Sequence, residues 1–445
     1  MAPFTLTHGR LPPGREMAKL RRLKIEKFRN VVPGTELRFH DGFNVLLGQN
    51  GTGKTNLLKL VAMALSSDFS QLEREAFAIE YEIEVGQVAV TVGLRNQLKT
   101  RHHGLPDIAR HHINIAADEA GASTDWSYSA RILGDRGALL ARLEGSPFGA
   151  SVTIGTSAEP VVVPNTSPFH GPFLYAGLII PSIEADGLID KVSANSLVVH
   201  FGRAMDRFDE ALGGFDTITG HGAELHFAVN EDGAIRRVIP SHVPQAVFIQ
   251  IHSRNLKIGD ERLILEHELL PFLATTITQC GFTEGHMTLA LKSLKRMSHG
   301  MDATYGDFSF SFTLDDGTVI THKDLSYGQK RLLSFLYHLA LRDDVVVADE
   351  LVNGLHYDWI EACIQEIGDR QAFLTSQNPI LLDFLPFESA EQVRQSFVLC
   401  RLERREGGSV MLWKNLDADA AEEFFRSYKT RALQVSEILR MQGLW

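Results

Sequence analysis

The chain has 445 residues, of which 22% are charged and 44% are hydrophobic, and its formal net charge is −11. This length allows two or three domains with buried cores, and the composition is that of a globular protein. The negative charge argues against a protein that coats nucleic acid by charge alone, although it permits a local basic surface. The three cysteines lie far apart, so they predict neither a disulfide framework nor a zinc site, and they fit a reducing cytoplasm.

The beginning of the chain and its most apolar stretch give no sign of a membrane protein. Residues 1–18 lack an apolar signal core, so we expect a flexible tail in which Met17 could serve as the native start. The stretch 173–183 is too short to span a bilayer and is interrupted by Gly177 and Pro181. We therefore expect no membrane association.

Residues 19–95 are predicted to form the first part of an α/β core. Their apolar patterns indicate short strands, one helix and a hairpin. The expected elements are strands at 21–31, 36–40 and 43–47, a helix from 53 to about 66, and hairpin strands at 78–85 and 88–92.

Residues 96–304 are irregular and rich in Gly and Pro, and we interpret them as one inserted α+β globular lobe. We expect a helix at 195–212 and another at 261–278 that is kinked at Pro271. No heptad pattern persists, so no coiled coil is predicted.

Regular patterns return in residues 305–415, which are predicted to complete the core, and residues 416–445 are predicted to form C-terminal helices. The expected elements are a hairpin at 308–325, a helix at 330–341, strands at 344–350 and 372–375, a hairpin turning at 406–408, and helices within 418–441.

A complete phosphate-loop motif, G-x-x-x-x-G-K-[ST], runs from Gly48 to Thr55 between an apolar strand and a helix. Glycine permits tight turning and close approach to phosphate, and the free N–H groups of the loop and helix start attract the anion. Lys54 can reach the β and γ phosphates of ATP, and the Thr55 hydroxyl can ligate Mg²⁺. The alternative is a glycine-rich turn without function. The predicted nucleotide-binding residues are Gly48, Asn50, Gly51, Gly53, Lys54, Thr55 and Asn56.

A second motif is the apolar run Val345–Ala348, which ends in Asp349 and Glu350. Carboxylates at the end of a buried strand suit a nucleotide site, in which Asp349 holds Mg²⁺ and Glu350 polarises the attacking water. The alternative is a strand that ends in solvated acids.

The third motif is the signature segment Leu325–Gln329, with the sequence L-S-Y-G-Q. Ser326 and Gly328 at a helix start offer a hydroxyl, free N–H groups and the helix dipole to an anion. The alternative is a capping box in which Ser326 pairs with Gln329.

The order of these three motifs resembles the ABC-type ATPase head family, whose signature is L-S-x-G-Q. The chain is most similar to the soluble branch of structural-maintenance-of-chromosomes (SMC), RecF-like and related repair ATPases, because LKIEKFRN opens the core. The run Asn353–His356, N-G-L-H, is similar to that of overcoming-lysogenisation-defect (OLD) defence ATPases. The resemblance covers about residues 19–95 and 305–400. It implies an α/β P-loop NTPase core of ABC-ATPase type with a mixed sheet.

The resemblance also implies a mechanism in which two heads sandwich ATP, giving a homodimer or higher homo-oligomer. Ser326, Gly328 and Gln329 would then contact the γ-phosphate held by the other copy. Asn353 and His356 would lie in the loop that links the two sites. Lys27 or Arg29 would either approach the nucleotide or form a solvated strand face.

This chain departs from the family where a switch histidine is usual, because Gln377 stands at that place. Glutamine can hydrogen-bond a γ-phosphate but cannot take up a proton as histidine can. We therefore expect slow hydrolysis or an ATP-gated clamp. Gln87 and Gln97 are weak candidates for the family's Q-loop. Neither a long coiled coil nor a Toprim nuclease domain is expected.

Three other groups of polar residues are better explained by structural roles than by metal or DNA binding. The histidines at 102, 103, 111 and 112 suit a surface loop better than a metal site. Asp417 and Asp419 favour a helix N-cap over a metal-binding D-x-D. A set of basic residues favours a solvated helix face over a DNA-binding patch. That set is Lys292, Lys295, Arg296, Arg236 and Arg237.

The motifs support two principal hypotheses of function. In the first, the protein is an ATP-dependent sensor or scaffold in a bacterial anti-phage defence system, with a separate effector such as a nuclease. In the second, it is a RecF-like repair ATPase that binds DNA. A transporter ATPase subunit is a weaker third reading, because the large insert and the N-G-L-H run do not favour it.

Overall fold

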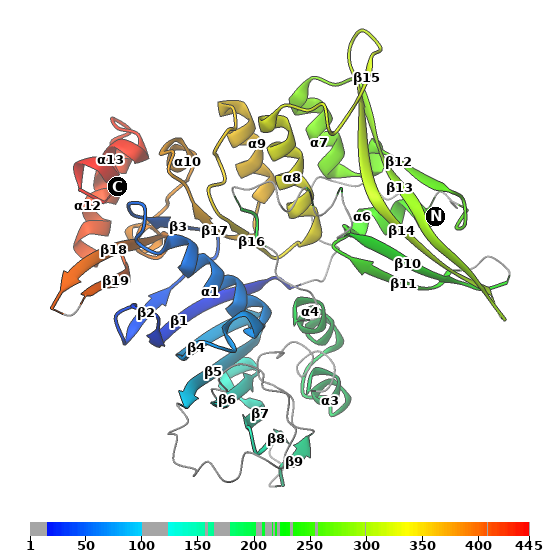
Figure 1. Cartoon of the computed structure of the whole chain (residues 1–445). Helices are drawn as coiled ribbons and strands as arrows, with labels where there is room; N and C mark the ends of the chain where they lie inside the picture. The colour runs from blue at the N-terminus through cyan, green and yellow to red at the C-terminus, as the bar shows by residue number, and fades with distance from the viewer. Residues whose placement is uncertain are drawn as a thin grey trace, which may run out of the picture. The chain divides into compact units, whose positions relative to one another are not determined.

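The structure is a computed structural model, and it places the chain in two compact units (Figure 1). Unit 2 comprises Gly14–Met205 and Ser389–Phe425, and unit 1 comprises Asp206–Glu388 and Arg426–Gly443, apart from short terminal pieces. The residues it describes are 16–99, 123–155, 159–163, 179–201, 207–209, 216, 219, 223–231, 235–253, 257–298, 300–406 and 408–444.

Unit 2 contains an antiparallel eight-stranded sheet with the strand order β2-β1-β4-β5-β6-β7-β8-β9. The alternation in FAIEYEIEV explains its faces, since Ile79, Tyr81 and Ile83 are buried while the glutamates between them are partly exposed. The strands are β1 (Ala18–Phe28), β2 (Thr35–Arg38), β4 (Phe77–Val85), β5 (Val88–Lys99), β6 (Ser123–Leu133), β7 (Leu139–Ser146), β8 (Gly149–Ile154) and β9 (Val161–Val163).

Unit 2 also holds β3 (Phe43–Leu47), which leads into the phosphate loop and α1 (Lys54–Ser66). Strand β3 runs parallel to β18 (Phe397–Arg405), which pairs antiparallel with β19 (Gly408–Asn415). Distant segments of the chain thus meet beside the phosphate loop. The remaining helices of this unit include α3 (Ile180–Ala185), α4 (Lys191–Phe201) and α11 (Ala390–Ser396), and α12 (Ala418–Lys429) begins in it.

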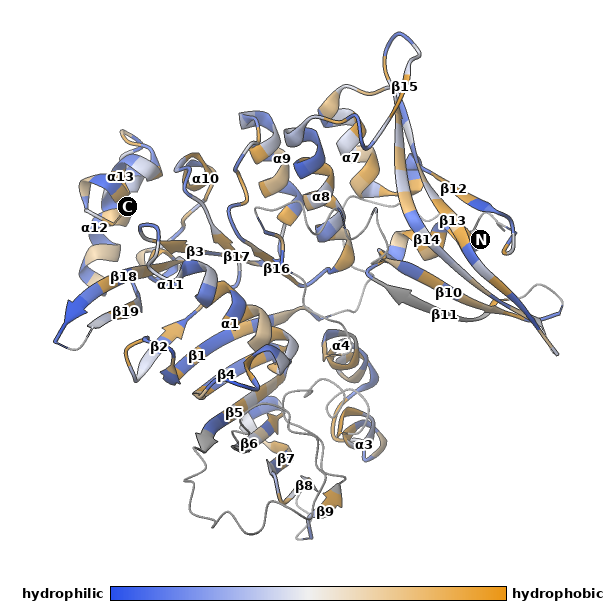
Figure 2. Ribbon diagram, in the orientation of Figure 1, coloured by the Kyte–Doolittle hydropathy of each residue, from blue (hydrophilic) through white to orange (hydrophobic). Residues whose placement is uncertain are grey.

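Unit 1 contains a second antiparallel sheet with the order β11-β10-β14-β13-β12, and β15 pairs with β14. Hydrophilic and hydrophobic residues alternate along much of β13 and β14 (Figure 2), as expected for strands with one buried face. The strands are β10 (Glu224–Val229), β11 (Ile235–Ser241), β12 (Arg262–Glu266), β13 (Glu284–Met297), β14 (Gly300–Thr313) and β15 (Val319–Thr321).

Asp349 and Glu350 belong to a second part of unit 1. There β16 (Val345–Ala348) runs parallel to β17 (Gln371–Thr375). All nine residues of these two strands are buried, as expected for parallel strands covered on both faces. The helices of this unit include α6 (Gln245–Ser253), α7 (Pro271–Cys280), α8 (Tyr327–Leu341), α9 (Tyr357–Ile367), α10 (Ile380–Asp383) and α13 (Val435–Met441).

The structure corrects several expectations for the middle of the chain. Residues 262–266 form β12 rather than helix, and Pro271 opens α7 instead of kinking it, because a first-turn proline lacks only an N–H that needs no partner there. Helix α4 spans Lys191–Phe201, and Phe208, which the predicted helix at 195–212 includes, instead forms an isolated β-bridge with Ala348.

The predicted inserted lobe, 96–304, is divided between the two units, because its first part extends the sheet of unit 2. Its two boundaries fall inside β5 and β14. The predicted tail, 1–18, lies outside the described residues up to residue 15, and β1 already begins at Ala18.

Candidate functional site

The phosphate loop, Gly48–Thr55, joins β3 to α1 in unit 2, as the sequence predicts. Gly48, Gly51 and Gly53 all have positive φ angles, of 150°, 81° and 88°. A Cβ atom on Gly48 would collide with the Cys400 carbonyl oxygen, and one on Gly53 would collide with the Met411 sulfur. Glycine is therefore required here for both backbone conformation and close packing.

Lys54 is 8% exposed, and its ammonium points back onto the loop. Its Nζ atom donates to the carbonyl oxygens of Gly48, at 2.7 Å, and Gln49, at 3.2 Å. The Thr52 hydroxyl also donates to Gln49 O, at 2.7 Å, and the indole N–H of Trp413 on β19 donates to Thr52 O, at 3.1 Å. These bonds hold the loop compact, with a positive charge available to phosphate.

Arg29 follows β1 and reaches α1 beside the loop. Its guanidinium donates to both carboxylate oxygens of Glu75, at 2.8 and 2.9 Å, and to Asn56 Oδ1, at 2.6 Å. The hydrogen bond from Arg29 lowers the pKa of the Glu75 carboxyl. Arg29 thus orients Asn56, whereas Lys27 lies on an exposed part of β1.

The acid pair, Asp349 and Glu350, follows β16 in unit 1, and each residue is 7% exposed. The Thr375 hydroxyl at the end of β17 connects them, since it donates to Asp349 Oδ1 at 2.5 Å and accepts from the Glu350 N–H at 2.8 Å. The solvated-acid alternative therefore does not describe these residues. The sequence did not single out Thr375.

Glu350 is held in a left-handed backbone conformation, with φ of 52°, which is uncommon for a residue with a side chain. Its N–H has Thr375 as a partner, and its carbonyl oxygen accepts from Arg331. Its Oε2 atom accepts from the backbone N–H of Gln377 at 2.8 Å. Gln377 therefore lies beside Glu350, but it is its main chain that makes this contact, and its side chain is exposed.

Arg331 is fully buried in α8, and it connects this helix to the chain after β16. It donates to the carbonyl oxygens of Glu350, of Leu351 at 3.4 Å and of Asp209 at 3.2 Å. No motif drew attention to Arg331, and the only signal in the sequence is its place on the apolar face of an amphipathic helix.

The signature segment begins α8, and Ser326 is its N-cap. The Ser326 Oγ atom accepts from the Gln329 N–H at 3.3 Å, and the Ser326 N–H donates to Gln329 Oε1 at 2.9 Å. The capping-box alternative is thus confirmed, and it coexists with an exposed Ser326 at a helix start, where an anion would be favoured.

Gly328 packs directly against the loop that follows the acid pair. A Cβ atom at Gly328 would lie 2.7 Å from the Gly354 carbonyl oxygen and 3.0 Å from the Trp359 ring. In this loop Asn353 is half-buried and His356 is exposed at the N-cap of α9. The signature segment and the N-G-L-H run therefore touch, as parts of unit 1.

Mg²⁺ is usually bound by one or two carboxylates together with water and substrate phosphates, and each motif contains an oxygen donor of a kind that it takes. Asp349 supplies a buried carboxylate in unit 1, and Thr55 supplies an exposed residue with a hydroxyl in unit 2. In the part of the chain that the structure describes, no group of three or more His, Cys, Asp or Glu residues forms a metal cage.

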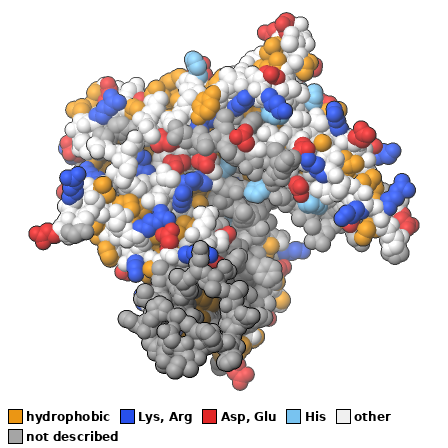
Figure 3. Space-filling model, in the orientation of Figure 1, with side chains coloured by type: hydrophobic (Ala, Val, Ile, Leu, Met, Phe, Trp, Pro, Cys, Tyr) orange, Lys and Arg blue, Asp and Glu red, His pale blue; other side chains and the backbone are white. Residues whose placement is uncertain are grey.

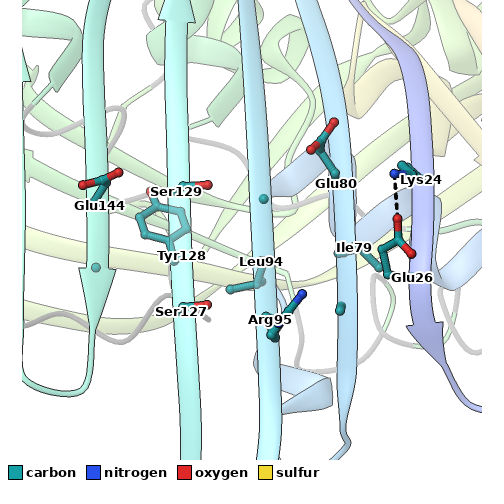
Figure 4. Close-up of a pocket in the computed structure, with 13 residues that line it drawn as sticks. Lys24, Glu26, Ile79, Glu80, Leu94, Arg95, Ser127, Tyr128, Ser129 and Glu144 are labelled. Atoms are coloured by element: carbon teal, nitrogen blue, oxygen red, sulfur yellow. Dashed lines mark ion pairs between the residues drawn. The ribbon is translucent and has the colours of Figure 1, made fainter. Parts of the chain in front are cut away.

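An open hollow of about 450 Å³ lies on the unit 2 sheet (Figure 4). Its walls carry both signs of charge, and Lys24 forms an ion pair with Glu26 there. Lys24, Glu26 and Glu80 come from β1 and β4, whereas Arg95 and Glu144 come from β5 and β7. Because the charged side chains that line the hollow have opposite signs, they do not favour a ligand of one particular charge.

The basic residues that the sequence analysis considered as a DNA-binding patch lie on two strands. Lys292, Lys295 and Arg296 lie on strand β13, which pairs antiparallel with β14, and not on a helix. Arg236 and Arg237 belong to β11.

The predicted helix N-cap at Asp417 is confirmed, since its Oδ1 atom accepts from the Ala420 N–H at 2.9 Å. The four histidines between 102 and 112 lie outside the described residues. Gln87 lies in the turn between β4 and β5, and Gln97 lies on β5.

Two protein-family models match the chain. One, described as "AAA domain", matches residues 22–115, which include the phosphate loop. The other, described as "AAA domain, putative AbiEii toxin, Type IV TA system", matches residues 198–383, which include the signature segment and the acid pair. The matches support the predicted P-loop ATPase fold in both units.

A curated relative, the DNA replication and repair protein RecF of Shewanella loihica, is 32% identical over 85 residues. This match covers 17% of the chain and 23% of the relative, so the chain spans under a quarter of that protein's length. Among solved structures, the SMC head domain from Thermotoga maritima is similar with a TM-score of 0.36 and 12% identity, over 90% of this chain and 99% of that one.

A second solved structure, an SMC head with an extended coiled coil bound to the C-terminal domain of ScpA, derived from Pyrococcus furiosus, has a TM-score of 0.35 and 12% identity. It covers 93% of this chain and 100% of that chain. Structural likeness at this level carries no argument about function. Among the described residues, no helix is long and apolar enough to cross a membrane.

Proposed function

We propose that this chain, an ABC-type ATPase of the SMC and RecF-like branch, binds ATP with Mg²⁺ and dimerises head to head around it. The observation that carries the proposal is the acid pair, in which the amide, the carbonyl and one carboxylate oxygen of Glu350 each have a partner. Such fixation holds a general base or water-orienting group in one geometry, which catalysis requires.

The phosphate loop would bind the triphosphate through its N–H groups and through Lys54. Thr55 and Asp349 would hold Mg²⁺, which, when bound, neutralises phosphate charge. Glu350 would orient the attacking water. Gln377 would contact the γ-phosphate without taking up a proton, so we expect slow turnover.

Dimerisation would follow from the signature segment. Ser326, Gly328 and Gln329 would contact the γ-phosphate held by a second copy of the chain. Ser326 and Tyr327 are exposed at the start of α8, where the helix dipole favours an anion. Nucleotide occupancy and assembly would then be one coupled equilibrium.

Two variants test this function. Lys54→Ala should lose ATP binding, because the charge that the loop holds is removed. Glu350→Gln should bind ATP but hydrolyse it at least about a hundredfold more slowly, and should remain dimeric with ATP. Nucleotide binding, phosphate release and mass in solution measure these outcomes. Normal hydrolysis by Lys54→Ala would refute the assignment.

For the biological role, we propose an ATP-dependent sensor or scaffold in anti-phage defence, acting in the cytoplasm with a separate effector such as a nuclease. The support is the family match over residues 198–383, whose description names a toxin of a toxin–antitoxin system, together with the N-G-L-H run. Co-purification with the products of neighbouring genes, with and without ATP, tests it.

The alternative is a RecF-like DNA-binding repair ATPase, which the relative matched over 85 residues supports. On the face seen in Figure 3, basic and acidic side chains of the described residues are interspersed rather than gathered by sign. Filter binding with and without ATP separates the two functions, because DNA binding would weaken steeply with salt.

A further inference from the structure

A three-residue segment, Arg207–Asp209, lies along β16 and brings an arginine to the acid pair. The Phe208 N–H donates to Val347 O at 3.0 Å, and the Asp349 N–H donates to Phe208 O at 2.8 Å. Phe208 thereby forms an isolated parallel bridge with Ala348. All of these residues belong to unit 1.

The segment is fixed from its other side by α8. The Phe208 ring is 6% exposed and lies edge-on to Phe335, with 5.1 Å between centroids. The Arg331 guanidinium stands 4.8 Å from the centroid of the Phe208 ring and donates to Asp209 O. These contacts of Phe208 and Asp209 fix the backbone next to Arg207, so the position of Arg207 does not depend only on its attraction to Asp349.

Arg207 directs its guanidinium toward one oxygen of Asp349. Its Nη1 atom lies 3.6 Å from Asp349 Oδ2, beyond hydrogen-bond length but within ion-pair range. The other oxygen, Oδ1, accepts the Thr375 hydroxyl. Arg207 Nη1 is buried and has no hydrogen-bond partner in the described structure.

This arrangement differs from that of a structural arginine. Arg331 is buried and donates to three carbonyl oxygens, which is how proteins usually satisfy a buried guanidinium. Arg207 instead holds a buried nitrogen beside the carboxylate that the sequence assigns to Mg²⁺. A cation that binds Asp349 Oδ2 must displace or repel this guanidinium.

We propose that Arg207 is a built-in counter-charge that competes with Mg²⁺ for Asp349 Oδ2, and so sets the Mg²⁺ concentration at which the site accepts ATP. The inference rests on the proposed function, because it assumes that Asp349 receives the metal. Arg207 is thus a positioning and regulatory residue that acts through Asp349.

The test measures binding of a fluorescent ATP analogue to the full chain while free Mg²⁺ is varied. For Arg207→Gln, half-maximal binding should require about three- to tenfold less Mg²⁺ than for the wild type, since a partly buried ion pair is removed. Arg207→Lys keeps the charge and should stay within about twofold of the wild type. Arg142→Gln removes a surface arginine that pairs with Glu144, and should leave the Mg²⁺ requirement unchanged.

An unchanged or increased Mg²⁺ requirement in Arg207→Gln overturns the inference, and so does an equal decrease in Arg207→Lys. Thermal melting checks that each variant is folded, and Arg207→Met carries the same test if Arg207→Gln does not fold. If the wild type itself binds no nucleotide with Mg²⁺, the proposed function fails instead.

Discussion

The phosphate loop of unit 2 and the acid pair of unit 1 are built in different ways. The loop bonds internally within Gly48–Thr55, through Lys54 and Thr52, and is buttressed by β18 and β19. The acid pair takes its partners from sites far along the chain. These are Arg207, Arg331, Thr375 and Gln377. A contiguous loop can be identified by its spacing, whereas an assembled site depends on tertiary structure.

We therefore expect the largest loss of stability when Arg331, which holds the backbone of the acid pair, is replaced. Arg331→Met should lower the free energy of unfolding by about 3 kcal/mol, because buried carbonyl oxygens lose their donors. Denaturant unfolding measures it, and phosphate release should fall as Glu350 loses its anchor. Arg401→Met, at an exposed position on β18, is the control and should change stability by less than about 0.5 kcal/mol.

If Arg331→Met were as stable as the wild type, the acid pair would not depend on distant support, and the contrast between the two regions would be lost.

A second variant separates catalysis from folding. Thr375→Val keeps the shape of the side chain but removes the hydroxyl that connects Asp349 with Glu350. We expect kcat to fall about thirtyfold, equivalent to about 2 kcal/mol, with ATP binding at the phosphate loop retained. Thr375→Ser keeps the hydroxyl and should recover most of the rate. Equal losses in both variants would assign the effect to packing rather than to the hydrogen bonds.

The sequence predicted the phosphate loop with its strand and helix, the acid pair and the signature segment. Strand β3 has the predicted bounds, 43–47, and α1 begins one residue after the predicted start. These features depend on local rules of glycine conformation, apolar runs and helix caps. Thr375, Arg207 and Arg331 could not be found that way. They occupy ordinary strand, loop and helix positions in the sequence, and their contacts with the acid pair arise only in the tertiary structure.

The middle of the chain was harder to predict for a different reason. Strand β13 contains shifts of register at 288–290 and 291–293, which interrupt the alternation that would identify a strand. Only a short 3-10 turn at His267–Leu269 and one further residue separate strand β12 from helix α7, so the apolar spacing predicted one continuous helix there. Turn chemistry and pairing partners, rather than periodicity, decide such segments.

A third variant examines whether the signature segment and the acid-pair loop are coupled. Gly328→Ala would place a Cβ atom 2.7 Å from Gly354 O, so the two segments must separate. We expect a loss of stability of about 1.5 kcal/mol and weaker ATP-dependent dimerisation. Gly42→Ala is the matched control, since its Cβ atom would meet only His40, at an ordinary 3.4 Å. Full dimerisation of Gly328→Ala would show that this contact does not transmit nucleotide binding.

We expect the smallest effect on stability from variants of Ser326. They distinguish its role as a helix cap from its proposed role in contacting a phosphate held by a second copy of the chain. Ser326→Ala should cost about 1 kcal/mol, because the helix cap is lost. Ser326→Asp keeps a good cap, so its free energy of unfolding should match the wild type, yet it places a negative charge where a partner's phosphate would bind. We expect Ser326→Asp to remain monomeric with ATP in light-scattering mass measurements. Should it dimerise like the wild type, Ser326 would be a cap alone, and the signature segment would not face a nucleotide.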